Sequence, residues 1–155
     1  MSPLDRAIAR LAADRKRGSA QLAREAASIL VRAAAAGLSA PELRSIAQTI
    51  AAAQPSMAAV TNTAAVFAEG IATPDESARR LATYWEEAPS ALANRHAGQL
   101  RGIVLTHSWS SDVMRTLETA RPALVVITEA RPGSEGVAAG ERLRAAGIDV
   151  RLVAD

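Results

Sequence analysis

The hydrophobic residues of the first hundred positions recur every three or four residues, which is the spacing of one face of an α-helix. Two Ser/Thr-x-x-Glu capping boxes, Ser39 to Glu42 and Thr73 to Glu76, mark helix starts. Gly37 suits the left-handed position that ends a helix, and Pro55 interrupts the pattern. We therefore predict five helices over about 4–14, 19–36, 40–54, 56–69 and 74–96, the last with a kink or restart at Pro89.

The pattern changes after Gly102. Three short apolar runs, rich in β-branched residues, cover 103–105, 124–127 and 148–153, and two stretches with helical spacing separate them. Strands that alternate with helices form a parallel sheet with right-handed crossovers. The predicted fold class is α/β: a helical domain at 1–98, then a truncated, Rossmann-like parallel βαβαβ half-sheet at 99–155.

Composition narrows the classes of function. The chain has no cysteine, which excludes disulfides, zinc thiolate sites and cysteine nucleophiles. The formal net charge is only +2 and aromatic residues make up 3%, so neither charge nor base stacking favours nucleic acid as a partner. No apolar run is long enough to span a membrane, and the first residues do not resemble a signal peptide. We expect a cytoplasmic protein.

Candidate chemistry lies at the carboxyl ends of the predicted strands, where open α/β sheets bind ligands. After the first strand, Ser110 or Ser111 is either the N-cap of the next helix or a contact to an anion at that helix end. After the second strand, Glu129 can accept hydrogen bonds from sugar hydroxyls, and Arg131 offers a guanidinium fork to phosphate. The alternative for Glu129 and Arg131 is a solvated loop with a local ion pair.

Other signals are weak. His107 follows the first strand and is either an acid–base group or a residue that holds loop backbone. The chain has two histidines and no clustered carboxylates, so we predict no metal site and no cofactor. Neither a GxGxxG motif nor a P-loop motif follows the first strand. Because the side chains of His107 and Ser108 diverge at a strand end, a hydrolase dyad is not expected.

Three segments carry a resemblance to a known family: IVLTHSWSS from Ile103, VITEARPGSEG from Val126, and AGIDV from Ala146. Together they resemble the family that unites the alpha, beta and delta subunits of translation initiation factor 2B with ribose-1,5-bisphosphate isomerase and methylthioribose-1-phosphate isomerase. In the helical half, Arg17-Gly18-Ser19 and Gln54-Pro55-Ser56-Met57-Ala58 are similar to the family's Arg-Gly and Arg-Pro-x-Met-Ala elements.

The resemblance implies a sugar-phosphate site at this strand edge. Arg17 and Gly18 would lie near phosphate, with Arg131 as a second contact and Thr106, His107 and Ser108 beside the ligand. The isomerases have their catalytic cysteine at the position of Ser108, and a hydroxyl needs an adjacent base to replace a thiol. Their catalytic aspartate and Asn-Lys-Ile-Gly-Thr element follow further strands that this sequence does not contain. We therefore lean against an enzyme and name no catalytic residue.

Three functions remain open at this point. The first is a non-catalytic, initiation-factor-2B-like protein that retains a site for a phosphorylated sugar or a nucleoside monophosphate. The second is a sugar-phosphate aldose–ketose isomerase that needs a partner chain, and the third is a purely structural interaction module. A half-sheet leaves the strand at 103–105 as an apolar edge, so we expect a homodimer or another homo-oligomer, or a partner chain that completes the sheet.

Overall fold

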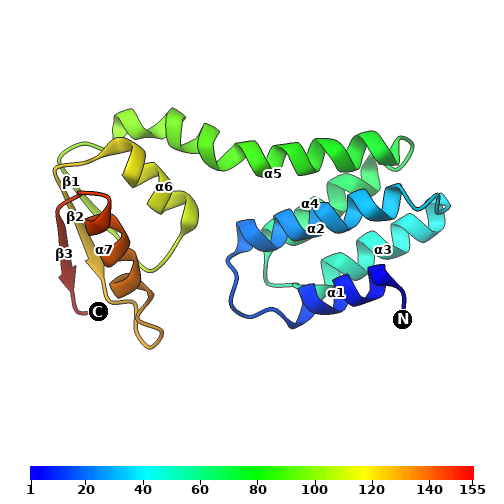
Figure 1. Ribbon diagram of the computed structural model, residues 1–155, viewed down its shortest axis with the longest axis horizontal. Helices are drawn as coiled ribbons and strands as arrows, with labels where there is room; N and C mark the ends of the chain where they lie inside the picture. The colour runs from blue at the N-terminus through cyan, green and yellow to red at the C-terminus, as the bar shows by residue number, and fades with distance from the viewer. The chain divides into compact units, whose positions relative to one another are not determined.

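The computed structural model describes residues 1–155 and divides them into two compact units, Met1–Glu87 and Ala88–Asp155. The elements appear in the predicted order (Figure 1): α1 Pro3–Ala13, α2 Ser19–Ala34, α3 Ala40–Ala53, α4 Ala58–Glu69, α5 Pro74–His96, the short 3-10 helix η1 Ala97–Gln99, β1 Ile103–Thr106, α6 Ser111–Ala120, β2 Leu124–Thr128, α7 Glu135–Ala145 and β3 Val150–Val153. The predicted fold class is confirmed.

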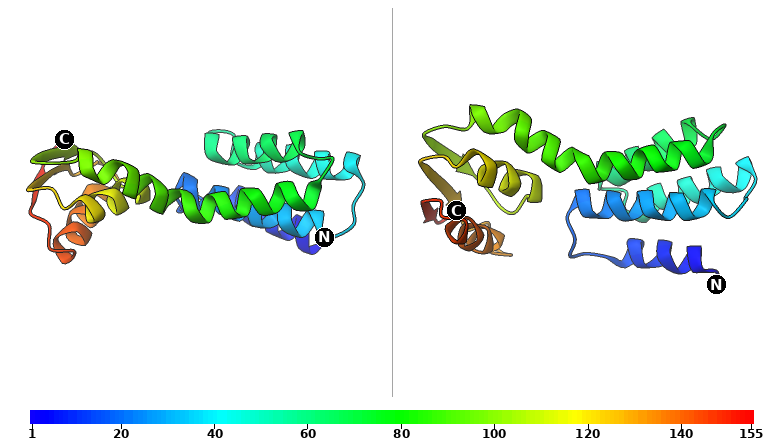
Figure 2. Two further views of the ribbon diagram at one scale, coloured as in Figure 1. Left: turned by 90° about the horizontal axis from the view of Figure 1, so that it is seen from above. Right: turned by 45° about the horizontal axis from the view of Figure 1, so that its top comes forward.

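The first unit, residues 1–87, is a helical bundle. Helices α1 to α4 lie side by side (Figures 1 and 2), and α5 enters the same core through Ala78 and Leu81. The core is rich in alanine, and its largest fully buried side chains include Phe67, Leu22 and Leu30. Small residues allow the helices to approach closely, while these few large side chains supply most of the buried apolar area.

Several predicted helix boundaries are confirmed. Ser39 precedes α3, and its backbone N–H and its hydroxyl both donate to the Glu42 carboxylate, while Gly37 ends the previous helical segment at φ +68°. Helix α5 is continuous through Pro89, where we expected a kink or restart. The division between the two units falls inside α5, while helix gives way to strand after η1. We retain a domain boundary after residue 98 as a proposal.

The second unit, residues 88–155, holds a three-stranded parallel sheet in the order β1-β2-β3. Both crossover helices pack on one face, because consecutive right-handed crossovers in the same direction place α6 and α7 on the same side (Figure 1). Val125 and Ile127 of β2 are fully buried beneath them, with Met114 of α6 and Leu143 of α7. This one-sided core defines the architecture of the second unit.

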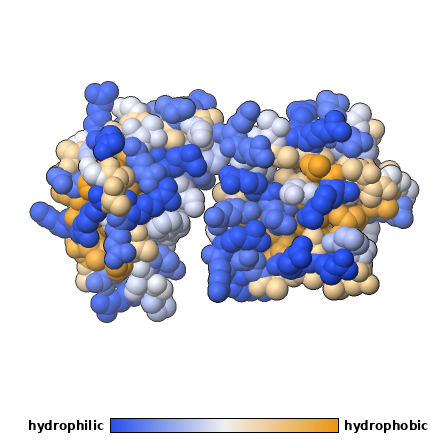
Figure 3. All heavy atoms as spheres, viewed as in Figure 1, coloured by the Kyte–Doolittle hydropathy of each residue, from blue (hydrophilic) through white to orange (hydrophobic).

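The opposite face of the sheet is uncovered. Ile103 and Leu105 of β1 each expose 72% of their surface, and Figure 3 shows apolar surface over the strand-bearing part of the chain. β1 pairs only with β2, so it is an edge strand, as expected for the first half of such a sheet. None of the helices is both long and apolar enough to cross a bilayer.

Gly136 explains how α7 approaches the end of β2. A Cβ atom at this position would lie 1.7 Å from the carbonyl oxygen of Thr128. The absence of a side chain lets the Gly136 N–H donate to the Glu129 carbonyl at 3.1 Å. A glycine at this point is therefore required by close backbone contact, and it fixes the start of α7 beside the strand edge.

Candidate functional site at the carboxyl edge of the sheet

The carboxyl ends of the three strands meet at one edge of the sheet, because the strands are parallel and in register. A hydrogen bond joins His107 Nδ1, after β1, to the hydroxyl of Thr128, at the end of β2. The imidazole is exposed and the hydroxyl is half-buried. A side chain that follows one strand is thus tied to the end of the next strand.

Asp155, after β3, extends this cluster. Its carboxylate accepts the backbone N–H groups of Arg131 and Ala130, the latter at 2.9 Å. These two bonds, chiefly that from Arg131, hold the pKa of Asp155 below its ordinary value, with smaller contributions from the Thr128 hydroxyl and the charge of His107. Asp155 therefore fixes the loop that begins after β2, and that loop carries the candidate ligand contacts.

Glu129 and Arg131 project from this loop as an ion pair. The Arg131 Nε atom lies 2.6 Å from the Glu129 carboxylate, and the two side chains expose 71% and 24% of their surface, respectively. The terminal guanidinium nitrogens of Arg131 have no partner in the protein. A solvent-facing fork of N–H donors next to a partly buried acceptor can bind a phosphate and a hydroxyl of the same small molecule.

The loop from His107 to Ser110 is held in an uncommon backbone conformation. Ser108 has φ +58°, in the left-handed region that non-glycine residues seldom adopt. Ser110 is the N-cap of α6, and its hydroxyl accepts the Val113 N–H at a long 3.4 Å. Ser111 is the first residue of α6. The structure thus assigns the predicted capping role to Ser110, while a ligand contact by either serine stays a prediction.

Trp109 links this loop to the helices that cover the sheet. Its ring lies 5.5 Å below the guanidinium carbon of Arg142 in α7, which is within the range of a cation–π contact. Arg142 also donates two hydrogen bonds to Glu118 of α6, at 2.5 and 2.9 Å. The bond to Arg142 lowers the pKa of Glu118, and the same bond raises the pKa of Arg142. Contacts of this kind limit the motion of the loop that carries Ser108 and Ser110.

Arg17 and Gly18 lie in the helical unit, at the turn between α1 and α2. Arg17 Nε binds the Asp14 carboxylate at 2.8 Å, and a second nitrogen lies 3.8 Å from Glu25. The backbone N–H groups of Arg17 and Lys16, with the Arg17 side chain, lower the pKa of Asp14 to about 2. The turn borders a hollow of about 540 Å³. Arg17 is thus held by carboxylates within its own unit.

Gln54 supports the same turn from inside. Its side-chain amide is buried and donates to the backbone carbonyls of Leu11 at 2.7 Å and Asp14 at 2.9 Å. The segment that starts with Gln54 is the one that is similar to the family's Arg-Pro-x-Met-Ala element. Its structural role is to hold the end of α1, and through it the backbone beside Arg17.

Sequence reasoning thus proposed nine site residues, and the structure collects seven of them at the edge of the sheet: Thr106, His107, Ser108, Ser110, Ser111, Glu129 and Arg131. It also adds Thr128 and Asp155, which were not chosen. The sequence signal that could have found them is their position, because Thr128 ends the second strand and Asp155 follows the third, and the ends of parallel strands meet at one edge of the sheet. Metal binding has no support, since no group of three or more His, Asp or Glu side chains converges.

Fold and strand edge together define an α/β chain with a helical first unit and the first half of a Rossmann-like domain. Residues 15–155 match the model of the initiation factor 2 subunit family, so the chain belongs to that family. It is an initiation-factor-2B-like protein, and the resemblance proposed from its sequence is confirmed. A comparison with curated proteins gave no significant match.

Solved structures show the same fold. The chain is similar to the translation initiation factor eIF-2B of Pyrococcus horikoshii, with 23% identity, a TM-score of 0.79, and 99% of this chain and 60% of that chain covered. It is also similar to a chain of the tetrameric eIF2B-beta2-delta2 complex from C. thermophilum, at 17% identity and a TM-score of 0.72 over 98% and 60% of the two chains. A third similar structure is eIF2B delta from Chaetomium thermophilum. The identity is 15% and the TM-score is 0.72, with 99% of this chain and 68% of that chain covered. The chain spans about 60% of the length of the first two structures.

Proposed function

We propose that this chain is a non-catalytic, initiation-factor-2B-like protein that binds a phosphorylated sugar or a nucleoside monophosphate at the carboxyl edge of its sheet. The observation that supports it best is the loop after β2. There Arg131 presents free guanidinium donors to solvent beside the half-buried Glu129 carboxylate, and Asp155 accepts the backbone N–H groups of Ala130 and Arg131. A phosphate would bind Arg131, while sugar hydroxyls would donate to Glu129.

The loop after β1 would face the other side of such a ligand. Its contributors are the hydroxyls of Thr106, Ser108, Ser110 and Ser111 and the exposed imidazole of His107. The amino end of α6 adds N–H groups that attract negative charge. Hydroxyls and a neutral or charged imidazole discriminate little between sugars, so we assign a ligand class rather than one compound.

The non-catalytic part of the proposal depends on Ser108. A serine hydroxyl is a much weaker acid than a thiol and acts as a nucleophile or acid only beside a base. The nearest candidate base is His107, but one of its ring nitrogens is already bonded to Thr128. His107 is adjacent to Ser108 in the sequence and is bonded to Thr128, so it is poorly placed to activate the Ser108 hydroxyl.

Arg17 and Gly18 are proposed as phosphate contacts on the family resemblance. A phosphate at this turn would compete with Asp14 and Glu25 for the guanidinium. Arg17→Ala tests this contact separately from Arg131→Ala. Unchanged ligand affinity in Arg17→Ala, with lower affinity in Arg131→Ala, would remove Arg17 from the site and leave the strand edge.

Calorimetric titration with ribose 5-phosphate and with adenosine monophosphate tests the binding proposal. We expect saturable binding that Arg131→Ala weakens at least about tenfold, the effect of losing a charge-assisted hydrogen bond. Arg101→Ala is the matched control, because Arg101 precedes β1 at the opposite end of the strand and its Nε donates to the Gly98 carbonyl. No binding of either compound at millimolar concentration would contradict the proposal.

Two other outcomes separate the alternatives. Turnover of ribose 1,5-bisphosphate or methylthioribose 1-phosphate, alone or with a partner chain, would support the aldose–ketose isomerase. Unchanged biological activity in Arg131→Ala, together with no ligand binding, would favour a purely structural interaction module.

We also propose that a second copy or a partner chain covers β1. Ile103 and Leu105 form an exposed apolar stripe on an edge strand, a surface that soluble proteins protect from uncontrolled pairing. The solved relative from C. thermophilum is described as a tetrameric complex, which makes association a reasonable expectation for this chain. Leu105→Lys should abolish association through β1 in light scattering, with Thr119→Lys on the exposed side of α6 as the control. A wild-type monomer at all concentrations, with no partner chain, would contradict this proposal.

A further inference from the structure

Four charged residues of α5 are arranged symmetrically about Thr83 on the exposed surface of the helical unit, and Asp75 and Glu76 add a further acidic block in the first turn of the helix. Arg79 and Arg80 lie on one side of Thr83, and Glu86 and Glu87 lie on the other, at nearly equal separations along the helix. All four charged side chains are exposed, and none of them forms an ion pair within the chain. A surface with equal and opposite charge blocks around a central residue is complementary to itself when one copy is turned end for end.

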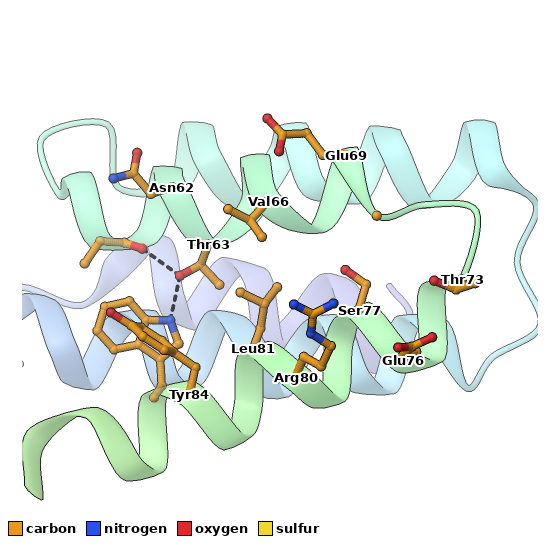
Figure 4. A pocket seen from close by; sticks show the side chains of 13 residues that line it. Asn62, Thr63, Val66, Glu69, Thr73, Glu76, Ser77, Arg80, Leu81 and Tyr84 are labelled. Atoms are coloured by element: carbon orange, nitrogen blue, oxygen red, sulfur yellow. Dashed lines mark hydrogen bonds between the residues drawn. The ribbon is translucent and has the colours of Figure 1, made fainter. Parts of the chain in front are cut away.

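A groove accompanies this charge pattern. It lies between α4 and α5 and has a volume of about 590 Å³ (Figure 4). Its lining includes the apolar side chains of Val66, Leu81, Tyr84 and Trp85 and the charged side chains of Glu69, Glu76 and Arg80. Val66 exposes 49% of its surface and Tyr84 exposes 59%, which are large values for such side chains. The groove is thus open to solvent along the same helix that carries the charges.

Hydrogen bonds and a contact between aromatic rings hold Trp85 in the wall of the groove. Trp85 donates its indole N–H to the Thr63 hydroxyl at 2.8 Å, and that hydroxyl donates to the Ala59 carbonyl at 2.7 Å (Figure 4). The Trp85 ring meets the Tyr84 ring edge-on, with 5.2 Å between their centres. An apolar surface that is already ordered loses little conformational freedom when it is covered.

We propose that α5 is a self-association surface, on which a second copy of this chain packs its own α5 antiparallel, with the crossing point at Thr83. The antiparallel arrangement places Arg79 and Arg80 of each copy against Glu86 and Glu87 of the other. It also places the two Tyr84 rings near the twofold axis, over the mouths of the two grooves. A parallel arrangement would place arginines against arginines and glutamates against glutamates, so the charge pattern selects the antiparallel one.

The ion pairs and the apolar contacts contribute to this association in different ways. Exposed ion pairs contribute little affinity but determine orientation and partner choice. Burial of Tyr84 and Val66 supplies the attraction, since tyrosine is a common anchor of protein interfaces. A second copy also fits better than a uniformly acidic or basic helix, because its Glu86/Glu87 and Arg79/Arg80 blocks meet the arginine and glutamate blocks of the first copy in reverse order. This surface is separate from the strand β1 and from the ligand site.

A single cysteine at the crossing point tests the geometry, because the chain has none of its own. Thr83→Cys, placed in the Leu105→Lys background so that β1 contributes nothing, should form a disulfide-linked dimer under mild oxidation. Ser45→Cys, on an exposed position of α3, is the matched control and should stay monomeric under the same conditions. Equal cross-linking of the two variants would overturn the assigned crossing point.

Charge exchange tests the orientation. In the same background, R79E/R80E and E86R/E87R should each weaken self-association at least about tenfold, because every ion pair becomes a repulsive pair. Mixing these two variants should restore a dimer with one copy of each, and the fourfold exchange R79E/R80E/E86R/E87R should restore the homodimer. Sedimentation velocity measures all four. A Leu105→Lys parent that is monomeric at all concentrations, or failure of both restorations, would overturn the proposal while leaving ligand binding at the strand edge and association through β1 untouched.

Discussion

The two units of this chain bury their apolar residues in different ways. In the helical unit, helices surround the core, and Leu22, Leu30 and Phe67 are fully enclosed. In the strand-bearing unit the core exists on one face of the sheet only, and the apolar side chains of β1 on the other face are exposed. The helical unit therefore encloses its core, while the sheet presents surface that a further element, copy or partner can cover.

This difference follows from topology rather than from the amount of hydrophobic sequence. A helix buries one stripe, and several helices can close around each other. A parallel sheet has two faces, and crossovers in one direction cover only one of them. The proposed ligand site and the edge strand both lie in the less protected unit, whereas the proposed self-association surface on α5 lies on the protected one.

Each unit contains one tryptophan, so the comparison can be measured directly. Trp85 belongs to the helical unit and Trp109 to the strand-bearing unit. In Trp109→Phe the fluorescence reports the helical unit, and in Trp85→Phe it reports the strand-bearing unit. The predictions below use these two reporter backgrounds.

The largest expected effect is that of Phe67→Ala. Phe67 is fully buried in the helical core, and its truncation leaves a cavity that should lower the free energy of unfolding by about 3–5 kcal/mol. Denaturant unfolding followed by Trp85 should show the loss, while Trp109 should not, because the two cores share no residue. Ser28→Ala, at an exposed position of α2, is the control, with an expected change within about 0.5 kcal/mol. An equal loss at both reporters would show that the units unfold as one.

Gly136→Ala should destabilise the strand-bearing unit and leave the helical unit unchanged. The added Cβ would meet the Thr128 carbonyl oxygen, so α7 must move away from β2, at a cost of about 2–3 kcal/mol. The loss should appear at Trp109 and not at Trp85. Gly98→Ala serves as the control, because a Cβ at Gly98 meets nothing within 4 Å. Normal stability of Gly136→Ala would mean that α7 has more freedom than the structure indicates.

Gln54→Ala should have a smaller effect on the helical unit. It removes a buried amide that donates to the carbonyls of Leu11 and Asp14, and a buried hydrogen bond lost in this way costs about 1–3 kcal/mol. Thermal unfolding followed by Trp85 measures this loss. The exposed Gln48→Ala should change nothing, and an equally small effect of both substitutions would contradict the supporting role of Gln54.

The smallest expected effect is a dependence of stability on pH. The pKa of Asp14 is lowered from 3.8 to about 2 in the folded chain, so its ionised form favours folding. That stabilisation is complete above the unfolded pKa and is lost as the pH falls from about 4 to 2. Asp14→Asn should flatten the stability of the helical unit in this interval. An unchanged pH profile in Asp14→Asn would show that other carboxylates dominate the acid response.

Much of the site was accessible to sequence reasoning because strand ends of a parallel sheet converge. Arg131 and Glu129 could be proposed from their place after an apolar run. The structure shows them as the local ion pair that was the alternative to a ligand contact, and the ligand contact stays a prediction. Thr128 and Asp155 were missed because their role comes from contacts between segments that are distant in sequence. The choice between Ser110 and Ser111 as N-cap also needed backbone geometry, since both positions fit the pattern.

The sequence by itself determined the order and type of the elements, because hydrophobic spacing, capping boxes and glycines act over a few residues. It also determined the family, since motifs such as Thr106 to Ser111 are short and contiguous and can be recognised in the sequence itself. Only the tertiary structure decided which face of the sheet is covered and that Asp155 holds the Arg131 loop. These features depend on crossover direction and on contacts between remote segments, and no local pattern encodes either of them.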